Sequence, residues 1–159
     1  MSGMLKAGLI GLVVGGLFGL GATIMSPVCT PCGAIFVGLG AGFLAAMWDK
    51  PLTRGGSAGL GAKAGAIAGV GHLIGQILGM VANMILVGPE QAAQIASQLG
   101  LDAQVMTQSQ YLVSQILING SCGVINIGIA AGLGALGGLL WYQTMGKNQV
   151  SPMQQPPVY

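Results

Sequence analysis

The three cysteines are the residues of this chain whose type and spacing best suit chemistry. Cys29 and Cys32 form a Cys-x-x-Cys pair, and Cys122 stands alone much later in the sequence. This spacing is typical of proteins that exchange thiols and disulfides. The same three residues could instead form a structural disulfide or remain as small thiols at a tight turn, and the sequence leaves these alternatives open.

A second group of polar residues is predicted to lie among apolar ones. His72, Gln76 and Asn83 share one face of a helical segment, and Asn126 is expected at a depth similar to that of Asn83. A neutral imidazole can ligate a haem iron or a chlorophyll magnesium, so a cofactor at His72 is one hypothesis. A single histidine without a second ligand favours the alternative, an interhelical hydrogen bond and no cofactor. A zinc site needs about four ligands, and we expect His72 to lie far in depth from the cysteines, so no metal site is predicted.

The composition indicates which elements position these residues. The chain has 159 residues, of which 53% are hydrophobic and only 5% are charged. A soluble domain carries about 25% charged residues, and a disordered chain combines low hydrophobicity with high charge. Neither describes this sequence, which therefore predicts an all-α integral membrane protein. The net charge of +2 is too small and too dispersed to indicate a nucleic-acid partner.

Four apolar segments are long enough to cross a bilayer, which takes about 20 helical residues. They cover Ala7–Met25, Cys32–Trp48, Ala64–Val87 and Ser121–Tyr142. All five basic residues lie outside these spans and, once the chain is threaded, on one side of the membrane: Lys6, Lys50, Arg54, Lys63 and Lys147. The positive-inside rule then places both termini in the cytoplasm. We expect a multi-pass protein of a prokaryotic plasma membrane, surrounded by the lipid bilayer.

An internal repeat relates the two halves of the chain. Residues 32–42 align with 122–132, with the cysteine, three glycines, one isoleucine and one alanine in common. Lys6-Ala-Gly likewise matches Lys63-Ala-Gly. Both helical hairpins start on the cytoplasmic side, so the repeat is parallel, with an axis along the membrane normal. The predicted units are one membrane domain over residues 1–148, with repeats over about 6–50 and about 63–147.

The second hairpin carries an insertion that the first lacks. The spacing between the repeated Lys and Cys is 33 residues longer there, and the extra residues lie near 88–120. Apolar residues recur at helical spacing in two parts of this segment, so we expect two amphipathic helices on the outer membrane surface. Asn119-Gly120-Ser121 predicts a break before the fourth span. At the other end of that span, residues 149–159 are rich in Pro and Gln and are expected to form a flexible tail.

Glycines recur at every fourth residue on the predicted helices. In lipid such small residues let helix backbones approach closely and gain dispersion contacts. The residues expected to pack in this way are Gly11, Gly15, Gly19, Gly38, Gly42, Gly65, Gly69, Gly75, Gly79, Gly128 and Gly132. These faces outnumber what one four-helix bundle requires, so we expect some of them to contact other membrane subunits or a second copy of the chain.

These features favour a non-catalytic small membrane subunit that packs through glycine-rich faces into a larger complex or a homo-oligomer. The first alternative is a membrane thiol–disulfide protein that uses Cys29 and Cys32. With four spans, the chain resembles the membrane thiol oxidoreductases that pass electrons to quinone, although those enzymes carry a second cysteine pair on a loop and residues 88–120 hold none. The second alternative is a passive pore or small-solute carrier. A proton-coupled transporter is disfavoured, because no Asp, Glu, Lys or Arg lies inside a predicted span.

Overall fold

The described part of the chain is helical and contains no strand. The computed structural model describes residues 2–25, 30–86, 94 and 108–149. Its elements are α1 (Gly3–Met25), α2 (Thr30–Asp49), α3 (Arg54–Leu86), α5 (Gln108–Thr144) and the short 3-10 helix η2 (Gly146–Gln149). Four helices are long and apolar enough to cross a membrane, over Gly3–Thr23, Cys32–Asp49, Arg54–Asn83 and Gly120–Thr144. The predictions of an all-helical fold and of four helices able to span a membrane are confirmed.

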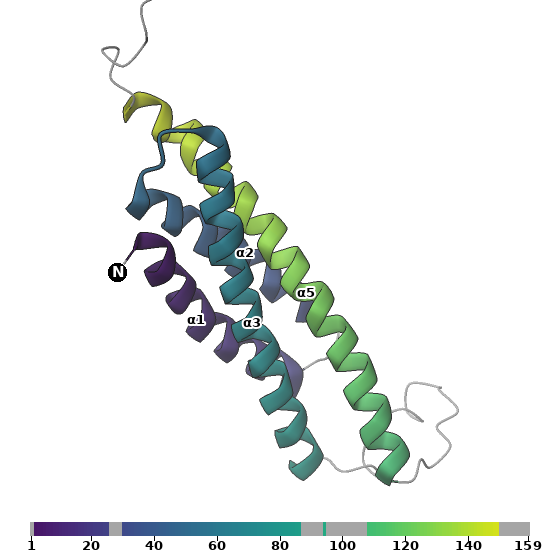
Figure 1. Cartoon of the computed structure of the whole chain (residues 1–159). Helices are drawn as coiled ribbons and strands as arrows, with labels where there is room; N and C mark the ends of the chain where they lie inside the picture. The colour runs from purple at the N-terminus through teal and green to yellow at the C-terminus, as the bar shows by residue number, and fades with distance from the viewer. Residues whose placement is uncertain (1, 26–29, 87–93, 95–107, 150–159) are drawn as a thin grey trace, which may run out of the picture.

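The four long helices form one bundle in which neighbours along the chain run in opposite directions (Figure 1). α1 packs against α2 and α3, and α5 packs against α2 and α3. The N-terminus, the connection between α2 and α3, and the last turns of α5 all lie at one end of the bundle, which we call the terminal end (Figure 1). The exposed basic side chains belong to segments that start or finish there: Lys6, Lys50, Arg54, Lys63 and Lys147.

The third helix begins earlier than the sequence predicted. Its apolar span was expected from Ala64, but the helix starts at Arg54 and includes Lys63. Lys and Arg are good helix formers, so they do not end a helix. Their charges indicate only where the membrane surface lies. The stretch before Ala64 therefore adds turns to α3 at the terminal end.

The connection between α2 and α3 is short, and its residues explain its geometry. Lys50 has a left-handed backbone conformation, with φ of 46°, and its N–H donates to the Ala46 carbonyl at 2.9 Å. This is a common way to end a helix, and Pro51, which has no N–H, cannot continue it. Thr53 then caps α3, because its Oγ1 accepts a hydrogen bond from the Gly56 N–H at 3.1 Å.

The predicted break at Asn119-Gly120-Ser121 is wrong, because α5 runs without interruption from Gln108 to Thr144. One glycine inside a helix costs about 1 kcal/mol relative to alanine. A break would instead create two helix ends, whose last N–H and C=O groups have no partner within the helix. The last part of the predicted insertion is therefore the first part of α5. Residues 87–93 and 95–107 of the insertion, and 150–159 of the tail, lie outside the described residues.

Small residues form the centre of the bundle, and large apolar residues cover its outside. The buried cluster consists of Ala7, Val37, Ala41, Ala45, Ala64 and Ala68. By contrast, Leu17, Phe36 and Ile85 are 69%, 73% and 79% exposed. This arrangement is expected for helices in lipid, where close backbone packing inside the protein replaces the hydrophobic core of a soluble domain.

Candidate functional site

Nine of the eleven glycines predicted to pack between helices lie at interfaces inside the bundle. A Cβ atom built on any of them would come within 3.0 Å of an atom on a neighbouring helix, so these sites require glycine. They are Gly11, Gly15, Gly19, Gly38, Gly42, Gly65, Gly69, Gly75 and Gly79. Most of the small faces are therefore used within a single chain.

The remaining two predicted glycines, Gly128 and Gly132, have open space around them. No atom of the described residues lies within 4 Å of a Cβ built at either position, and both residues are exposed. Val124 and Ile125, one turn earlier on α5, are 67% and 62% exposed. The outer face of α5 thus presents a shallow slot of small residues beside large apolar side chains.

His72 lies in the middle of the bundle and is fully buried. Its Nδ1 is 3.2 Å from the Gly15 carbonyl oxygen of α1, and it donates to that oxygen in the tautomer with the proton on Nδ1. The imidazole also lies near the Phe18 ring, with centroids 6.4 Å apart, and against Gly33 of α2. The side chain predicted to make an interhelical hydrogen bond thus contacts two neighbouring helices. A cofactor at His72 stays a prediction.

Two buried amides, one on α3 and one on α5, each have an atom without a hydrogen-bond partner among the described residues. They are the Oε1 of Gln76 on α3 and the Nδ2 of Asn126 on α5. The two residues are only 1% and 3% exposed. One atom is an acceptor and the other a donor, so each could pair with a small polar molecule such as water.

Asn83 and Asn126 do not lie at the same depth, contrary to the expectation from the sequence. The Nδ2 of Asn83 donates to the Thr23 carbonyl at 3.2 Å, near the end of α1. Asn126 precedes Ile127, which packs against Gly69 about four turns earlier on α3. The reason is the register of α3 and α5, which the sequence alone did not determine.

Cys32 and Cys122 are both exposed and free. The glycines that follow them, Gly33 and Gly123, both pack against the turn of α3 that holds His72. The expectation that His72 lies far in depth from the cysteines is therefore wrong, because the first turns of α2 reach the middle of α3 and not its end. Among the described residues, no three His, Cys, Asp or Glu side chains are grouped in a way that could hold a metal.

Cys29 lies outside the described residues, so the structure gives no geometry for the Cys29–Cys32 pair. A redox pair there and a disulfide among Cys29, Cys32 and Cys122 stay predictions, as does the passive pore or carrier.

Two polar residues that the sequence had not singled out join helices near the terminal end. The Ser57 hydroxyl donates to the Gly138 carbonyl at 2.5 Å. The Asp49 carboxylate accepts hydrogen bonds from the N–H groups of Gly3 and Met4, both at 2.6 Å. Each bond links residues far apart in sequence, and no local spacing predicts it.

A function for this chain can be inferred only from its sequence and geometry. No protein-family model, curated protein or solved structure matched this chain. Three features of the described residues could carry a function: the open face of α5, the buried polar turn around His72 and the exposed thiols. Of these, the outer face of α5 is the one where the described residues leave predicted packing glycines without a neighbouring helix.

Proposed function

We propose that this protein is a non-catalytic, small integral membrane subunit that associates with a second copy or with another membrane protein through the outer face of α5. The observation that carries the proposal is the open environment of Gly128 and Gly132. The other nine glycines predicted to pack have a neighbouring helix within the chain, whereas these two have none among the described residues.

The energetics of helix association in lipid support this role for the slot. Lipid tails are as apolar as leucine, so helices gain from association chiefly by close van der Waals packing. Gly128 and Gly132 are one turn apart and would let a partner backbone approach. Val124, Ile125 and Leu136, each more than half exposed, would then pack beside the partner helix. A partner would thus give a packing reason for two glycines that cost about 1 kcal/mol each relative to alanine in a lone helix.

The orientation that we propose has both termini in the cytoplasm of a prokaryotic cell. It is supported by the placement of the exposed basic residues, all of which belong to segments that start or finish at the terminal end. Lys and Arg accumulate on the cytoplasmic side of membrane proteins. Trp48, which is 40% exposed near that end of α2, is of the residue type that is enriched at membrane interfaces.

The proposed repeat has support from contacts between α1 and α3. Gly11 packs on Ala68, Gly15 on the backbone of His72, and Gly19 on the backbone of Gln76. Each pair has the same sequence separation as Lys6 and Lys63, which begin the aligned segments. The first helices of the two repeats are thus parallel neighbours with aligned residues in contact, which supports a parallel repeat.

The association is tested by replacing both open glycines, Gly128→Leu together with Gly132→Leu, and measuring the mass of the purified protein in mild detergent. The wild type is expected to form a complex larger than one chain, and the double variant to run as a folded monomer, because leucine fills the slot but favours the helix. Gly21→Leu is the matched control, since Gly21 lies on α1 in open space. It should leave the complex intact.

Two outcomes would refute the proposal. One is a wild-type protein that is monomeric and co-purifies with no partner. The other is a double variant that is helical by circular dichroism and still forms the wild-type complex. Haem or chlorophyll at His72 is tested on the same sample, since either pigment absorbs visible light.

A further inference from the structure

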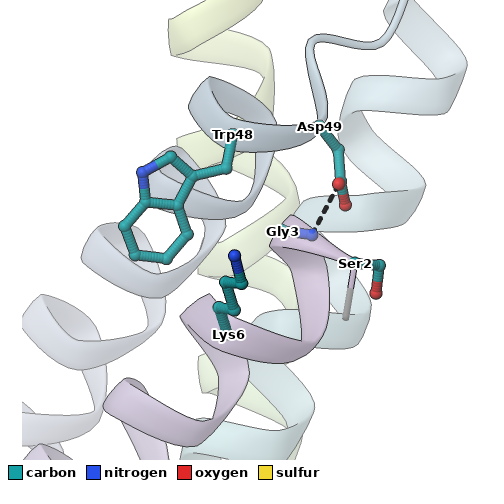
Figure 2. A pocket seen from close by; sticks show the side chains of 5 residues that line it. All are labelled: Ser2, Gly3, Lys6, Trp48 and Asp49. Carbon is teal, nitrogen blue, oxygen red and sulfur yellow. Dashed lines mark hydrogen bonds between the residues drawn. The ribbon is translucent and has the colours of Figure 1, made fainter.

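A polar pocket lies at the terminal end, where the beginning of α1 meets the end of α2. It has a volume of about 470 Å³ and is lined by Ser2, Gly3, Lys6, Trp48 and Asp49. Figure 2 shows Lys6 extending from α1 between Trp48 and Asp49 in this view. The pocket therefore offers one ammonium group, one carboxylate and one indole at the level expected for lipid headgroups.

The carboxylate of Asp49 is held in place by α1. Its two oxygens accept hydrogen bonds from the Gly3 and Met4 N–H groups, both at 2.6 Å. A negative charge is favourable at this position because the helix dipole is positive at the N-terminus. Each carboxylate oxygen has a second acceptor site, so Asp49 can also accept a hydrogen bond from a ligand in the pocket.

A second, apolar groove lies between the same two helices, α1 and α2. It has a volume of about 240 Å³ and is formed by residues of α1 and α2, among them Ala7, Phe18, Phe36 and Leu44. Ala7 directly follows Lys6, and Leu44 is one turn before Trp48, so the groove is lined by residues within one turn of the pocket on both helices. Pockets that enclose whole drug-sized molecules have volumes of roughly 300–1,000 Å³, so this groove is too small for one. Because it is apolar and elongated along the helices, it suits part of an acyl chain.

We propose that the pocket and the groove together bind one phospholipid with a zwitterionic, amine-bearing headgroup, of the phosphatidylethanolamine class. The lipid phosphate pairs with the Lys6 ammonium, and the lipid ammonium pairs with the Asp49 carboxylate. One acyl chain lies in the groove, and the Trp48 ring lies beside the glycerol region, where indoles are enriched.

Charge complementarity selects this occupant over two others. An anionic lipid would satisfy Lys6 but would place a net negative charge beside Asp49. A helix from a second copy could cover the groove, but an apolar helix would offer no partner to the Lys6 ammonium and no donor to the remaining acceptor sites of Asp49. The site is on α1 and α2, whereas the proposed association uses α5, so neither proposal depends on the other.

The test is native mass spectrometry of the purified full-length protein after exchange into micelles that contain phosphatidylethanolamine, phosphatidylglycerol or no phospholipid. We expect one bound phosphatidylethanolamine per chain and at least about fivefold less phosphatidylglycerol at equal concentration. Lys6→Gln should lower the retained phosphatidylethanolamine by about tenfold, since it removes a charge-assisted hydrogen bond. Lys63→Gln is the matched control, because Lys63 is an exposed cation at the same end but does not line the pocket.

Two further variants separate the headgroup from the chain. Gly40 lines the groove and has open space at its Cβ position, so Gly40→Leu should fill the groove without disturbing the fold and reduce retention of both lipids. Asp49→Asn removes the negative charge while keeping one acceptor oxygen, and it should abolish the preference for phosphatidylethanolamine.

Several results would overturn the proposal. Equal retention of both lipids by the wild type refutes the zwitterionic selectivity. Unchanged retention in Gly40→Leu, in a protein that is still helical, shows that the lipid binds elsewhere. A drop in complex mass caused by Gly40→Leu but not by Lys6→Gln identifies a second copy as the occupant.

Discussion

Gly38 and Gly42 of α2 align with Gly128 and Gly132 of α5, but the two pairs have opposite environments. A Cβ on Gly38 would lie 2.6 Å from the Ala130 carbonyl oxygen, and one on Gly42 would overlap the backbone of Gly134. Gly128 and Gly132 have nothing within 4 Å. The pattern of residues is the same in both segments, so the difference arises from how each helix is rotated in the bundle.

The rotation of α5 explains the difference. Residues two apart on a helix point about 200° apart, so Ala130 and Gly134 lie nearly opposite Gly128 and Gly132. α5 therefore has small residues on two sides. Ala130 and Gly134 pack against both α2 and α3, while the other side is left without a neighbour within the described residues. A small-residue pattern thus indicates that a helix can pack closely, but not which side is already occupied.

The largest expected effect compares Gly42→Ala with Gly132→Ala. The first variant forces a methyl group into the Gly134 backbone and should destabilise the protein by about 2–3 kcal/mol. The second meets no atom and should be neutral, or stabilising by up to about 1 kcal/mol because alanine favours the helix. Unfolding in mixed detergent micelles, followed by circular dichroism, gives both values. Equal losses in the two variants would mean that the outer face of α5 is packed within the chain.

The helices themselves could be predicted well from the sequence. The expected spans Ala7–Met25 and Cys32–Trp48 lie within α1 and α2 and end within one residue of them. Apolar length and the positions of charged residues are local properties, and in lipid they determine where helices form. The same reasoning placed the start of α3 ten residues too late, because Arg54 and Lys63 were taken as boundaries of the helix and not only of the membrane.

The contacts between helices could be predicted only in part. The face of α3 with His72 was expected to bond a neighbouring helix, because a polar group in lipid requires a partner. That Gly15 supplies the carbonyl depends on the register between α1 and α3, which the apolar pattern of each helix does not specify. The bond from Ser57 to Gly138 and the cap that Asp49 forms on α1 depend on the same kind of long-range placement.

The next largest effect is expected at His72, which is buried inside the bundle. His72→Leu removes the bond to the Gly15 carbonyl and should cost about 1–2 kcal/mol, since hydrogen bonds between membrane helices contribute about 0.6–1.7 kcal/mol and the new shape packs less well. The same micelle unfolding assay measures it. Leu136→Ala is the control for a general loss of apolar contact, because Leu136 is exposed on the outside of α5. It should lower the free energy of unfolding by less than His72→Leu does.

A change of opposite sign is expected one turn further along α3. The Gln76 carbonyl oxygen is buried without a hydrogen-bond partner, and such a group costs about 1–3 kcal/mol. Gln76→Met keeps the length of the side chain and removes both amide atoms, of which only Oε1 is buried without a partner, so it should stabilise the protein by up to about 1 kcal/mol. A loss of stability would instead indicate that a bound polar molecule, such as water, partners Gln76 in the native protein.

The smallest expected effect concerns two serines, one inside the bundle and one on the open outer face of α5. Ser57 is fully buried and donates to the Gly138 carbonyl, whereas Ser121 is exposed on α5 near the open slot. Ser57→Ala should cost about 0.6 kcal/mol, the average for hydrogen bonds between membrane helices. Ser121→Ala should change the unfolding of the single chain by less than that, because a surface serine has no helix partner to lose. Ser121→Ala could instead lower the free energy of unfolding by more than this at high protein concentration, and not after dilution in detergent. Ser121 would then belong to the contact between subunits, and the contact surface would extend a further turn along α5.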